Sequence, residues 1–191
     1  MSLKETMQAE VFSESDDVLL IKWLESAQVL HQWGSPSMSF PPTKASLVKA
    51  RSTKKDKRIA YKGTIGHRPV AYGEIGYIDK INCSARLCKI LVDPHQRGAG
   101  LGTAWVKTLL KICFQELGLN RIELNVYDQN QRAIKCYQRA GFTIEGLLRE
   151  TYRVEEGFWS VYRLSILRRE WAQQPGISKQ TKIFNHITIE Q

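Results

Sequence analysis

The segment VDPHQRGAGLG, residues 92–102, constrains this chain more than any other stretch of its sequence. It places three glycines in five positions, directly after the apolar segment 84–92 and before residues 103–118, whose apolar side chains recur at helical spacing. A strand that turns through glycines into a helix exposes backbone N–H groups at the positive end of the helix dipole. Glycine also lets a ligand approach the backbone closely. The segment therefore predicts a cradle for the phosphates of a di- or polyphosphate ligand.

Two phosphate-binding motifs compete for this turn, and their spacing separates them. A P-loop needs lysine and then serine or threonine directly after its last glycine, whereas Gly102 is followed by Thr103 and Ala104. A dinucleotide turn has the spacing G-x-G-x-x-G, and here the third glycine arrives one residue early. Glu123 stands about 20 residues further on, where that motif places its ribose-binding acid. Dinucleotide binding is therefore kept as a weaker alternative.

The rest of the chain predicts one α/β (α+β) domain. Expected helices cover residues 15–30, 43–50, 103–118 and 129–141. Expected strands begin at Val11 and Phe12 and continue at 57–65, 68–78, 84–94, 121–127, 142–150 and 158–167. The strands before the glycine turn suit an antiparallel meander, and one strand-helix-strand unit follows. We expect a mixed, mostly antiparallel sheet flanked by helices within residues 1–171, followed by a loosely held tail at 172–191.

Charge and composition limit the classes of partner. The net charge is +9, and the first 42 residues hold only two of the 28 basic side chains but six of the 19 acidic ones. The basic remainder suits a polyphosphate, an acidic protein or RNA. No apolar run reaches the length of a membrane span and the N-terminus has no apolar signal core, so we expect a cytoplasmic protein without a membrane partner. The four cysteines lack C-x-x-C spacing and surrounding histidines, so no metal is expected.

Two motifs together resemble the GNAT superfamily of acetyl-CoA-dependent N-acetyltransferases. Arg97-x-x-Gly100-x-Gly102, after a strand that ends in LVDP, is similar to the family's acetyl-CoA pyrophosphate motif. The segment NQRAIKCYQRAGF is similar to a later helix of the family. Its matching positions are Asn130, Ala133, Tyr137, Gly141 and Phe142. The resemblance covers about residues 9–171 and is closest in character, through GFTIEGLLRE and SILRREW, to the subgroup that acetylates ribosomal-protein N-termini and other small amines.

The resemblance implies a GNAT-like fold and a set of site residues. The sheet would splay open between the strand before the glycine turn and the strand after the following helix, with acetyl-CoA in the split. The backbone of Ile90, Leu91 and Val92 would bind the pantetheine arm. Asn130 would bind this arm or the adjacent loop, and Tyr137 would point its hydroxyl at the thioester sulfur. The pyrophosphate would be wrapped by Arg97, Gly98, Ala99, Gly100, Leu101, Gly102 and Thr103.

The chemistry of acetyl transfer adds candidate catalytic residues. At pH 7 the neutral form of an alkyl amine with a pKa near ~10.4 costs about 4.6 kcal/mol, but that of an α-amine near ~7.8 costs only about 1 kcal/mol. Glu74, on the expected strand 68–78, is the candidate base, ahead of Glu123. Tyr137 is a weak acid for a thiolate with a pKa near ~8.5, so we describe it as a positioned hydrogen-bond donor. The resemblance places a second donor, for the carbonyl oxygen, at a backbone N–H near Val92.

Each candidate also has a purely structural alternative. Tyr137 could be a core tyrosine, Glu74 a paired strand carboxylate and Asn130 a helix cap. The aromatic residues Trp33, Phe40 and Tyr72 could fill the core or line an acceptor pocket, and the core is the expected place.

The sequence thus predicts an N-acetyltransferase that moves an acetyl group from acetyl-CoA to a primary amine of a protein, peptide or small molecule by direct attack in a ternary complex. A non-catalytic CoA-binding sensor or regulatory module is the alternative. Nucleic acid is not the expected partner, because no aromatic-basic recognition signature is present. A ribosome-associated substrate and a homodimer paired through the last strand stay open, and the acceptor itself has no recognisable motif.

Overall fold

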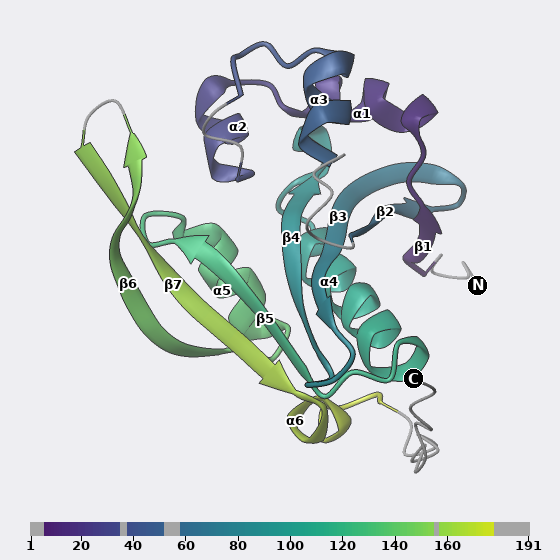
Figure 1. Ribbon diagram of the computed structural model, residues 1–191. Coiled ribbons are helices and arrows are strands. Elements are labelled where there is room, and N and C mark those ends of the chain that lie inside the picture. Colours follow the sequence, from purple (N-terminus) through teal and green to yellow (C-terminus); the bar gives the residue numbers. More distant parts are fainter. Residues whose placement is uncertain (1–5, 35–37, 52–57, 155–156, 178–191) are drawn as a thin grey trace.

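The computed structural model describes residues 6–34, 38–51, 58–154 and 157–177. Within these ranges seven strands form one sheet in the order β1-β2-β3-β4-β5-β7-β6 (Figure 1). Only β4 and β5 pair in parallel; the other neighbours are antiparallel, which confirms the expected mixed, mostly antiparallel sheet. The strands are β1 (Gln8–Val11), β2 (Ile59–Ile65), β3 (Arg68–Asp79), β4 (Ser84–Val92), β5 (Arg121–Tyr127), β6 (Thr143–Val154) and β7 (Gly157–Leu167).

The helices flank this sheet on both faces. Short α1, α2 and α3 gather over one end of β3 and β4, whereas α4 runs along the sheet and α5 lies beside β5 (Figure 1). The long helix continues from α4 into one π-helical turn at Ile112–Glu116, and Gly118, with φ of 68°, follows it. The helices are α1 (Asp17–Trp23), α2 (Ala27–Gln32), α3 (Lys44–Arg51), α4 (Leu101–Lys111), α5 (Gln131–Arg139) and α6 (Arg168–Ala172).

The single helix expected over residues 15–30 is wrong, because the chain breaks it into α1 and α2. Ser26 is the cause: its hydroxyl accepts a hydrogen bond from the N–H of Val29 at 3.2 Å and caps a new helix. Serine competes with helical hydrogen bonding in this way and therefore favours a helix start over a helix interior. After the break, Trp23 of α1 and Trp33 at the end of α2 both pack into the smaller core.

Two apolar cores lie on opposite faces of the sheet. The larger core joins the sheet to α4, α5 and α6, and the smaller core joins Tyr72 and Leu91 of the sheet to the N-terminal helices. Trp105 of α4 anchors the larger core: a Cβ built at Gly63 of β2 would lie 2.7 Å from its ring, and one built at Gly73 of β3 would lie 3.0 Å from it. Burial of each large apolar side chain contributes roughly 1.5–3 kcal/mol.

The chain after residue 171, expected to be loosely held, contacts the domain over its described part. Trp171 of α6 is buried with its ring 5.2 Å from that of Phe114. Beyond it, Gln174 donates a hydrogen bond from Nε2 to the carbonyl of Ala140 at 3.0 Å, and Ile177 packs against the larger core. The rest of the expected tail lies outside the described residues, and the domain boundary at 171 stays a prediction.

The last strand, β7, lies between two neighbours for most of its length: it pairs with β5 over residues 161–167 and with β6 over residues 157–165. A dimer paired through the last strand stays a prediction. The outer strand on this side is β6. Its residues 143–151 are all exposed, and they include three large apolar side chains: Ile144, Leu147 and Leu148.

Candidate active site

The sheet splays open between β4 and β5. The two strands pair only where Ser84, Ala85 and Arg86 face residues 121–123, and further along they diverge (Figure 1). On its other edge β4 carries a bulge: Tyr72 pairs with Leu91 and Glu74 with Cys88, so Lys89 and Ile90 oppose one residue of β3. Bulges bend a strand and redirect its side chains, which explains how β4 leaves its neighbour. This split confirms the opening expected from the family resemblance.

A large cavity of ≈ 790 Å³ occupies one side of the split. It is bounded by the end of β4, the glycine turn, α5 and part of α2. The structure brings together here every expected acetyl-CoA residue except Ala99. These cavity-lining residues are Ile90, Leu91, Val92, Arg97, Gly98, Gly100, Leu101, Gly102, Thr103, Asn130 and Tyr137.

The glycine turn has the geometry of an anion cradle. Gly98 and Gly100 have φ of 93° and 79°, a region that other residues enter only with strain, and no atom lies within 4 Å of a Cβ built at either. Gly100 is the N-cap of α4, so the first N–H groups of that helix have no partner within it. These groups and the open space beside them fit phosphate oxygens. Arg97 borders the cradle and pairs with Glu25 at 2.9 Å.

Exposed cations of α5 also line this cavity. Arg132, Lys135 and Arg139 lie on one side of the helix and face the glycine turn across the opening. No Asp or Glu belongs to the cavity lining in the described part of the chain. Sequence reasoning missed these residues, although their spacing of three and four along an amphipathic helix is the signal that could have found them.

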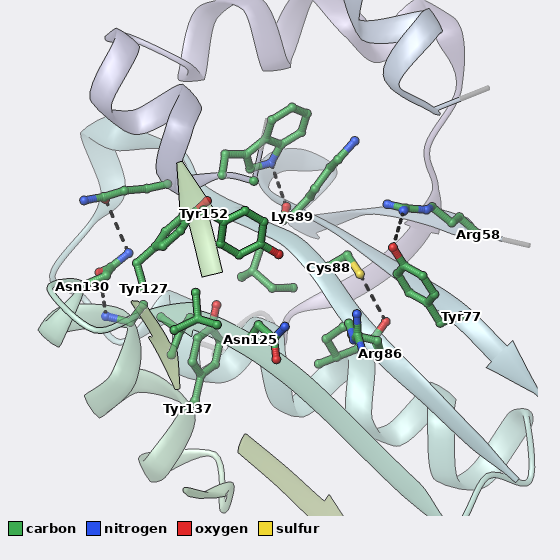
Figure 2. Close-up of a pocket in the computed structure, with 18 residues that line it drawn as sticks. Arg58, Tyr77, Arg86, Cys88, Lys89, Asn125, Tyr127, Asn130, Tyr137 and Tyr152 are labelled. Carbon is green, nitrogen blue, oxygen red and sulfur yellow. Dashed lines mark hydrogen bonds between the residues drawn. The ribbon is translucent and has the colours of Figure 1, made fainter. Parts of the chain in front are cut away.

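A smaller cavity of ≈ 220 Å³ lies on the other side of the split and meets the first at Tyr137 (Figure 2). Tyr137 is 8% exposed, and its burial raises the pKa of the phenol well above its ordinary value. Its hydroxyl has no hydrogen-bond partner among the described residues. A protonated hydroxyl at the junction of two cavities suits a donor to a group that bridges them.

Asn130 combines the two roles considered for it. Its side-chain oxygen accepts a hydrogen bond from the N–H of Ala133 at 3.2 Å, which caps α5. Its amide nitrogen donates to Oε1 of Gln32 at 3.4 Å, and the residue lines both cavities. The cap therefore fixes the side chain of Asn130 at the cavity wall.

Comparison with known proteins identifies the fold and its family. Residues 24–142 match the model of the acetyltransferase (GNAT) family. The chain belongs to this family. It is 23% identical over 155 residues to the aminoglycoside N(6')-acetyltransferase type 1 of Klebsiella pneumoniae, covering 74% of this chain and 76% of the relative.

Polyamine acetyltransferases are also similar to this GNAT chain. The spermidine N(1)-acetyltransferase of Escherichia coli is 27% identical over 93 residues, about half of each chain. A crystal structure of the spermidine N-acetyltransferase of Vibrio cholerae with CoA and spermine has the same fold, with a TM-score of 0.74 and 19% identity over 87% of this chain and 98% of that one. A specific likeness to the ribosomal-protein subgroup stays a prediction.

Two further findings describe this GNAT domain. In the described residues no group of His, Cys, Asp and Glu side chains is arranged to hold a metal ion. None of the described helices is both long and apolar enough to cross a membrane.

The structure does not bring Glu74 into either cavity of the acetyltransferase. Its carboxylate is 1% exposed, and both oxygens are engaged. Oε1 accepts a hydrogen bond from the hydroxyl of Tyr72 at 2.6 Å and lies 3.4 Å from Nζ of Lys89, while Oε2 accepts one from Arg58 at 3.1 Å. These contacts correspond to the structural alternative, a paired strand carboxylate. Direct proton abstraction by Glu74 stays a prediction that this geometry disfavours.

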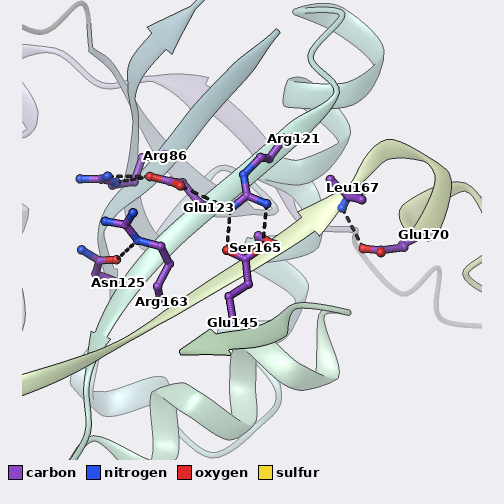
Figure 3. A network of polar contacts seen from close by, with 9 residues as sticks. All are labelled: Arg86, Arg121, Glu123, Asn125, Glu145, Arg163, Ser165, Leu167 and Glu170. Atoms are coloured by element: carbon purple, nitrogen blue, oxygen red, sulfur yellow. Dashed lines mark hydrogen bonds and ion pairs between the residues drawn. The ribbon is translucent and has the colours of Figure 1, made fainter. Parts of the chain in front are cut away.

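Glu123, the poorer candidate base, is held by arginines (Figure 3). It accepts hydrogen bonds from Nε and Nη2 of Arg86, and it lies 3.6 Å from Arg121. Burial would raise the pKa of Glu123, but the bonds and the charge of Arg86 outweigh this effect and hold the pKa below its ordinary value. A carboxylate with a lowered pKa is a weaker base.

The expected aromatic residues divide between core and cavity. Tyr72 is fully buried, with its ring 4.7 Å from that of Phe12, as the core alternative predicted. Trp33 is buried and also lines both cavities, and its indole N–H donates to the carbonyl of Lys89 at 2.8 Å. Phe40 is 45% exposed and lines neither cavity.

Most of the smaller cavity went unrecognised in the sequence. Its walls come from segments scattered over more than half of the chain, so no local motif marks them. The polar and aromatic residues missed are Gln32, Arg58, Tyr77, Arg86, Cys88, Lys89, Asn125, Tyr127 and Tyr152.

Proposed function

We propose that this GNAT chain acetylates a primary amine, with acetyl-CoA in the larger cavity and the amine in the smaller one. One observation carries the proposal: the two cavities meet at Tyr137 in the split of the sheet. A binding module for CoA alone would need only the larger cavity. The second cavity, open to the same hydroxyl, supports a ternary complex with direct attack.

The residues of the larger cavity fit acetyl-CoA by their chemistry. The N–H groups at the start of α4 and the cations of α5 bind the phosphates. The backbone of Ile90, Leu91 and Val92, at the diverging edge of β4, binds the pantetheine arm. When bound there, acetyl-CoA supplies an activated thioester carbonyl at the junction.

The transfer joins the amine nitrogen to the acetyl carbon and breaks the carbon–sulfur bond. The nitrogen loses a proton, and the departing sulfur gains one. Tyr137 donates a hydrogen bond to that sulfur, and a backbone N–H near Val92 donates to the carbonyl oxygen. Because Tyr137 is buried and protonated, its main role is to donate a hydrogen bond to the sulfur, and transfer of its proton is secondary.

The neutral amine arises without a carboxylate in the cavity wall. No Asp or Glu lines the smaller cavity in the described residues, whereas Arg58, Arg86 and Lys89 do. Desolvation and nearby positive charge both disfavour an ammonium group, so the bound amine loses its proton more readily than in water. In this arrangement Glu74 acts as a positioning residue that holds Lys89 and Arg58. An α-amine suits the site best, because its ordinary pKa is already near ~7.8.

The finer expectations are part of the same proposal. A cytoplasmic location is supported by the four cysteines, all of them free thiols, as a reducing compartment requires. The α-amine preference keeps a ribosome-associated protein substrate open. A homodimer would pair through the outer strand β6, which carries the exposed apolar side chains Ile144, Leu147 and Leu148.

Acetyl transfer with Tyr137→Phe tests the proposal. Release of the CoA thiol is followed with a panel of primary amines, after calorimetric titration with acetyl-CoA and, as a control ligand, NADH. Losing a hydrogen bond to a charged group costs about 1.5–3 kcal/mol, so we expect kcat to fall about 10- to 100-fold with little change in the KM for acetyl-CoA.

Tyr61→Phe is the matched control, since Tyr61 lies in β2 and lines neither cavity. An effect of Tyr137→Phe confined to KM would reassign this residue to binding. Acetyl-CoA binding without transfer to any amine would instead identify the non-catalytic module. Preference for NADH would exclude both the acetyltransferase and the CoA-binding module.

A further inference from the structure

We propose that the amine acceptor carries an anionic group, a carboxylate or a phosphate, which binds Arg58, Arg86 and Lys89 in the smaller cavity. The inference rests on the proposed acetyl transfer and narrows its acceptor. A spermidine-like polycation is thereby disfavoured, even though the fold is shared with polyamine acetyltransferases.

The charge of the cavity wall is the first observation. Arg58, Arg86 and Lys89 line it, and no acidic side chain does so in the described part of the chain. In the described ranges, the carboxylates of Glu74 and Glu123 contact these cations without lining the cavity themselves. The charged groups that face the ligand are therefore cations. A ligand of opposite charge would complete the arrangement.

The two arginines are fixed in place by one tyrosine. The guanidinium of Arg58 lies 5.1 Å from the centre of the Tyr77 ring, and that of Arg86 lies 4.6 Å from it. Arg58 also donates to the Tyr77 hydroxyl at 3.2 Å. Arginine binds carboxylate and phosphate through paired N–H donors, and a guanidinium already held in position loses less entropy on binding. Nη1 of Arg86 has no hydrogen-bond partner among the described residues and remains able to donate.

Lys89 extends the positive wall toward the reaction point. It stands in the β4 bulge with φ of 52°, next to Ile90, which lines both cavities. Its Nζ lies 3.4 Å from Glu74 and 4.8 Å from the centre of the Trp33 ring, so the side chain is held on two sides. Burial lowers the pKa of Lys89, while the charge of Glu74 opposes that effect.

The two ends of the smaller cavity therefore differ in chemistry. Residues shared with the acetyl-CoA cavity, Tyr137 and Asn130 among them, mark the end where the amine must lie. Arg58 and Tyr77 line only the smaller cavity and lie toward its other side in Figure 2. An acceptor with its amine at Tyr137 and its anion at the arginines spans this space. A second ammonium group in the same place would meet like charge.

Matched acceptor pairs test the inference. The first pair is the C-terminal amides of alanyl-glutamate and alanyl-glutamine, which differ only in the side-chain carboxylate; the second is phosphoethanolamine and ethanolamine. Spermidine is the polycation of comparison. We expect kcat/KM for the anionic member of at least one pair to exceed that of its neutral partner by about tenfold or more, since a site built for a charged partner leaves its own groups unpaired with the analogue. The pair that shows the difference identifies whether the cavity binds a carboxylate or a phosphate.

Arg86→Gln is the decisive variant. It should remove most of the preference by raising the KM of the anionic acceptor, while the KM for acetyl-CoA stays within about twofold. Arg121→Gln is the matched control, because Arg121 contacts the same Glu123 but lines neither cavity (Figure 3). It should leave the preference unchanged.

The outcomes separate this inference from the proposed function. Acetylation of the neutral acceptors or spermidine as efficiently as the anionic ones would overturn the inference and leave acetyl transfer standing. If no amine is acetylated, calorimetric titration of the CoA-saturated protein with the same pairs decides. If the anionic member binds and Arg86→Gln abolishes this binding, the anion site is supported although acetyl transfer is not. If both members bind equally, or neither binds, the anion site is overturned.

Discussion

The two cavities that meet at Tyr137 differ in how the chain builds them. The larger one is made almost entirely from two short segments, the end of β4 with the glycine turn and one face of α5. The smaller one draws residues from five strands, β3 to β7, from the end of α2 and the residues after it, from α5, and from Arg58 just before β2. In the proposed assignment the larger cavity would hold a constant ligand with backbone groups, whereas the smaller one presents side chains, which can vary without disturbing the fold.

The strongest test of this contrast removes the backbone cradle alone. Gly100→Val should raise the dissociation constant of acetyl-CoA on the order of 100-fold, because a side chain in the open space would displace phosphate from N–H groups that together supply about 3 kcal/mol. Calorimetric titration measures the loss.

Gly118→Val is its matched control. Gly118 also has positive φ, 68° against 79° at Gly100, and also has open space at its Cβ position, but it follows the far end of the long helix. Both variants should lose about 1–3 kcal/mol of stability through backbone strain. Equal losses of acetyl-CoA affinity in the two would mean that strain, and not the cradle, controls binding.

A smaller effect should come from the cations that α5 adds to the larger cavity. Arg132→Gln combined with Lys135→Gln should weaken acetyl-CoA binding about five- to tenfold, since exposed charge pairs contribute roughly 0.2–1 kcal/mol each. The difference from the unmodified chain should shrink as salt rises, because ions screen exposed charges. Affinity measured at two ionic strengths gives the result.

The control for the α5 cations is Lys107→Gln combined with Lys111→Gln, which removes two exposed lysines from α4 outside both cavities. A similar loss in this control would attribute the effect to overall charge. The acceptor KM should change in neither variant, which keeps the two cavities functionally distinct.

The smallest expected effect, one on stability alone, comes from the ion pair of Glu145 and Arg121 (Figure 3), which lines neither cavity. Bonds from Arg121, followed by one from Ser165, lower the pKa of Glu145 to about 2. Because this folded-state pKa lies below the ordinary 4.5, the pair stabilises the protein above pH 4.5 and loses that contribution as the pH falls toward 2.

Glu145→Gln should therefore lower the free energy of unfolding by about 0.5–1 kcal/mol at pH 7, a value reduced for solvent exposure, and by progressively less below pH 4.5. Urea unfolding across pH checks it. Glu150→Gln, on the same strand, removes a carboxylate with no ion pair in the described residues and should show no such dependence. A loss of acetyl transfer in Glu145→Gln would show that the network reaches the active site after all.

The sequence was sufficient wherever neighbouring residues act together. Alternation and helical spacing located β2, β3, β4 and β5 closely, and the glycine turn before α4 lies where its motif indicated. The helix break at Ser26 was missed because a local hydrogen bond outweighed a continuous apolar pattern. Two partners of Glu74 were also beyond reach: Tyr72 is only two residues away on β3, but Arg58 and Lys89 meet Glu74 through strand pairing and the β4 bulge.

The sequence by itself determined the fold class, the glycine turn before α4 and the place of Tyr137 in α5, because each depends on residues close together in the chain. Only the tertiary structure decided which charges line the smaller cavity. Strand order brought Arg58, Arg86 and Lys89 to one wall, while Glu74 and Glu123 contact them without lining it. The physical reason is that each ion pair has a cationic and an anionic member. The pairing of the strands decides which member lines the cavity, and no local sequence pattern encodes that choice.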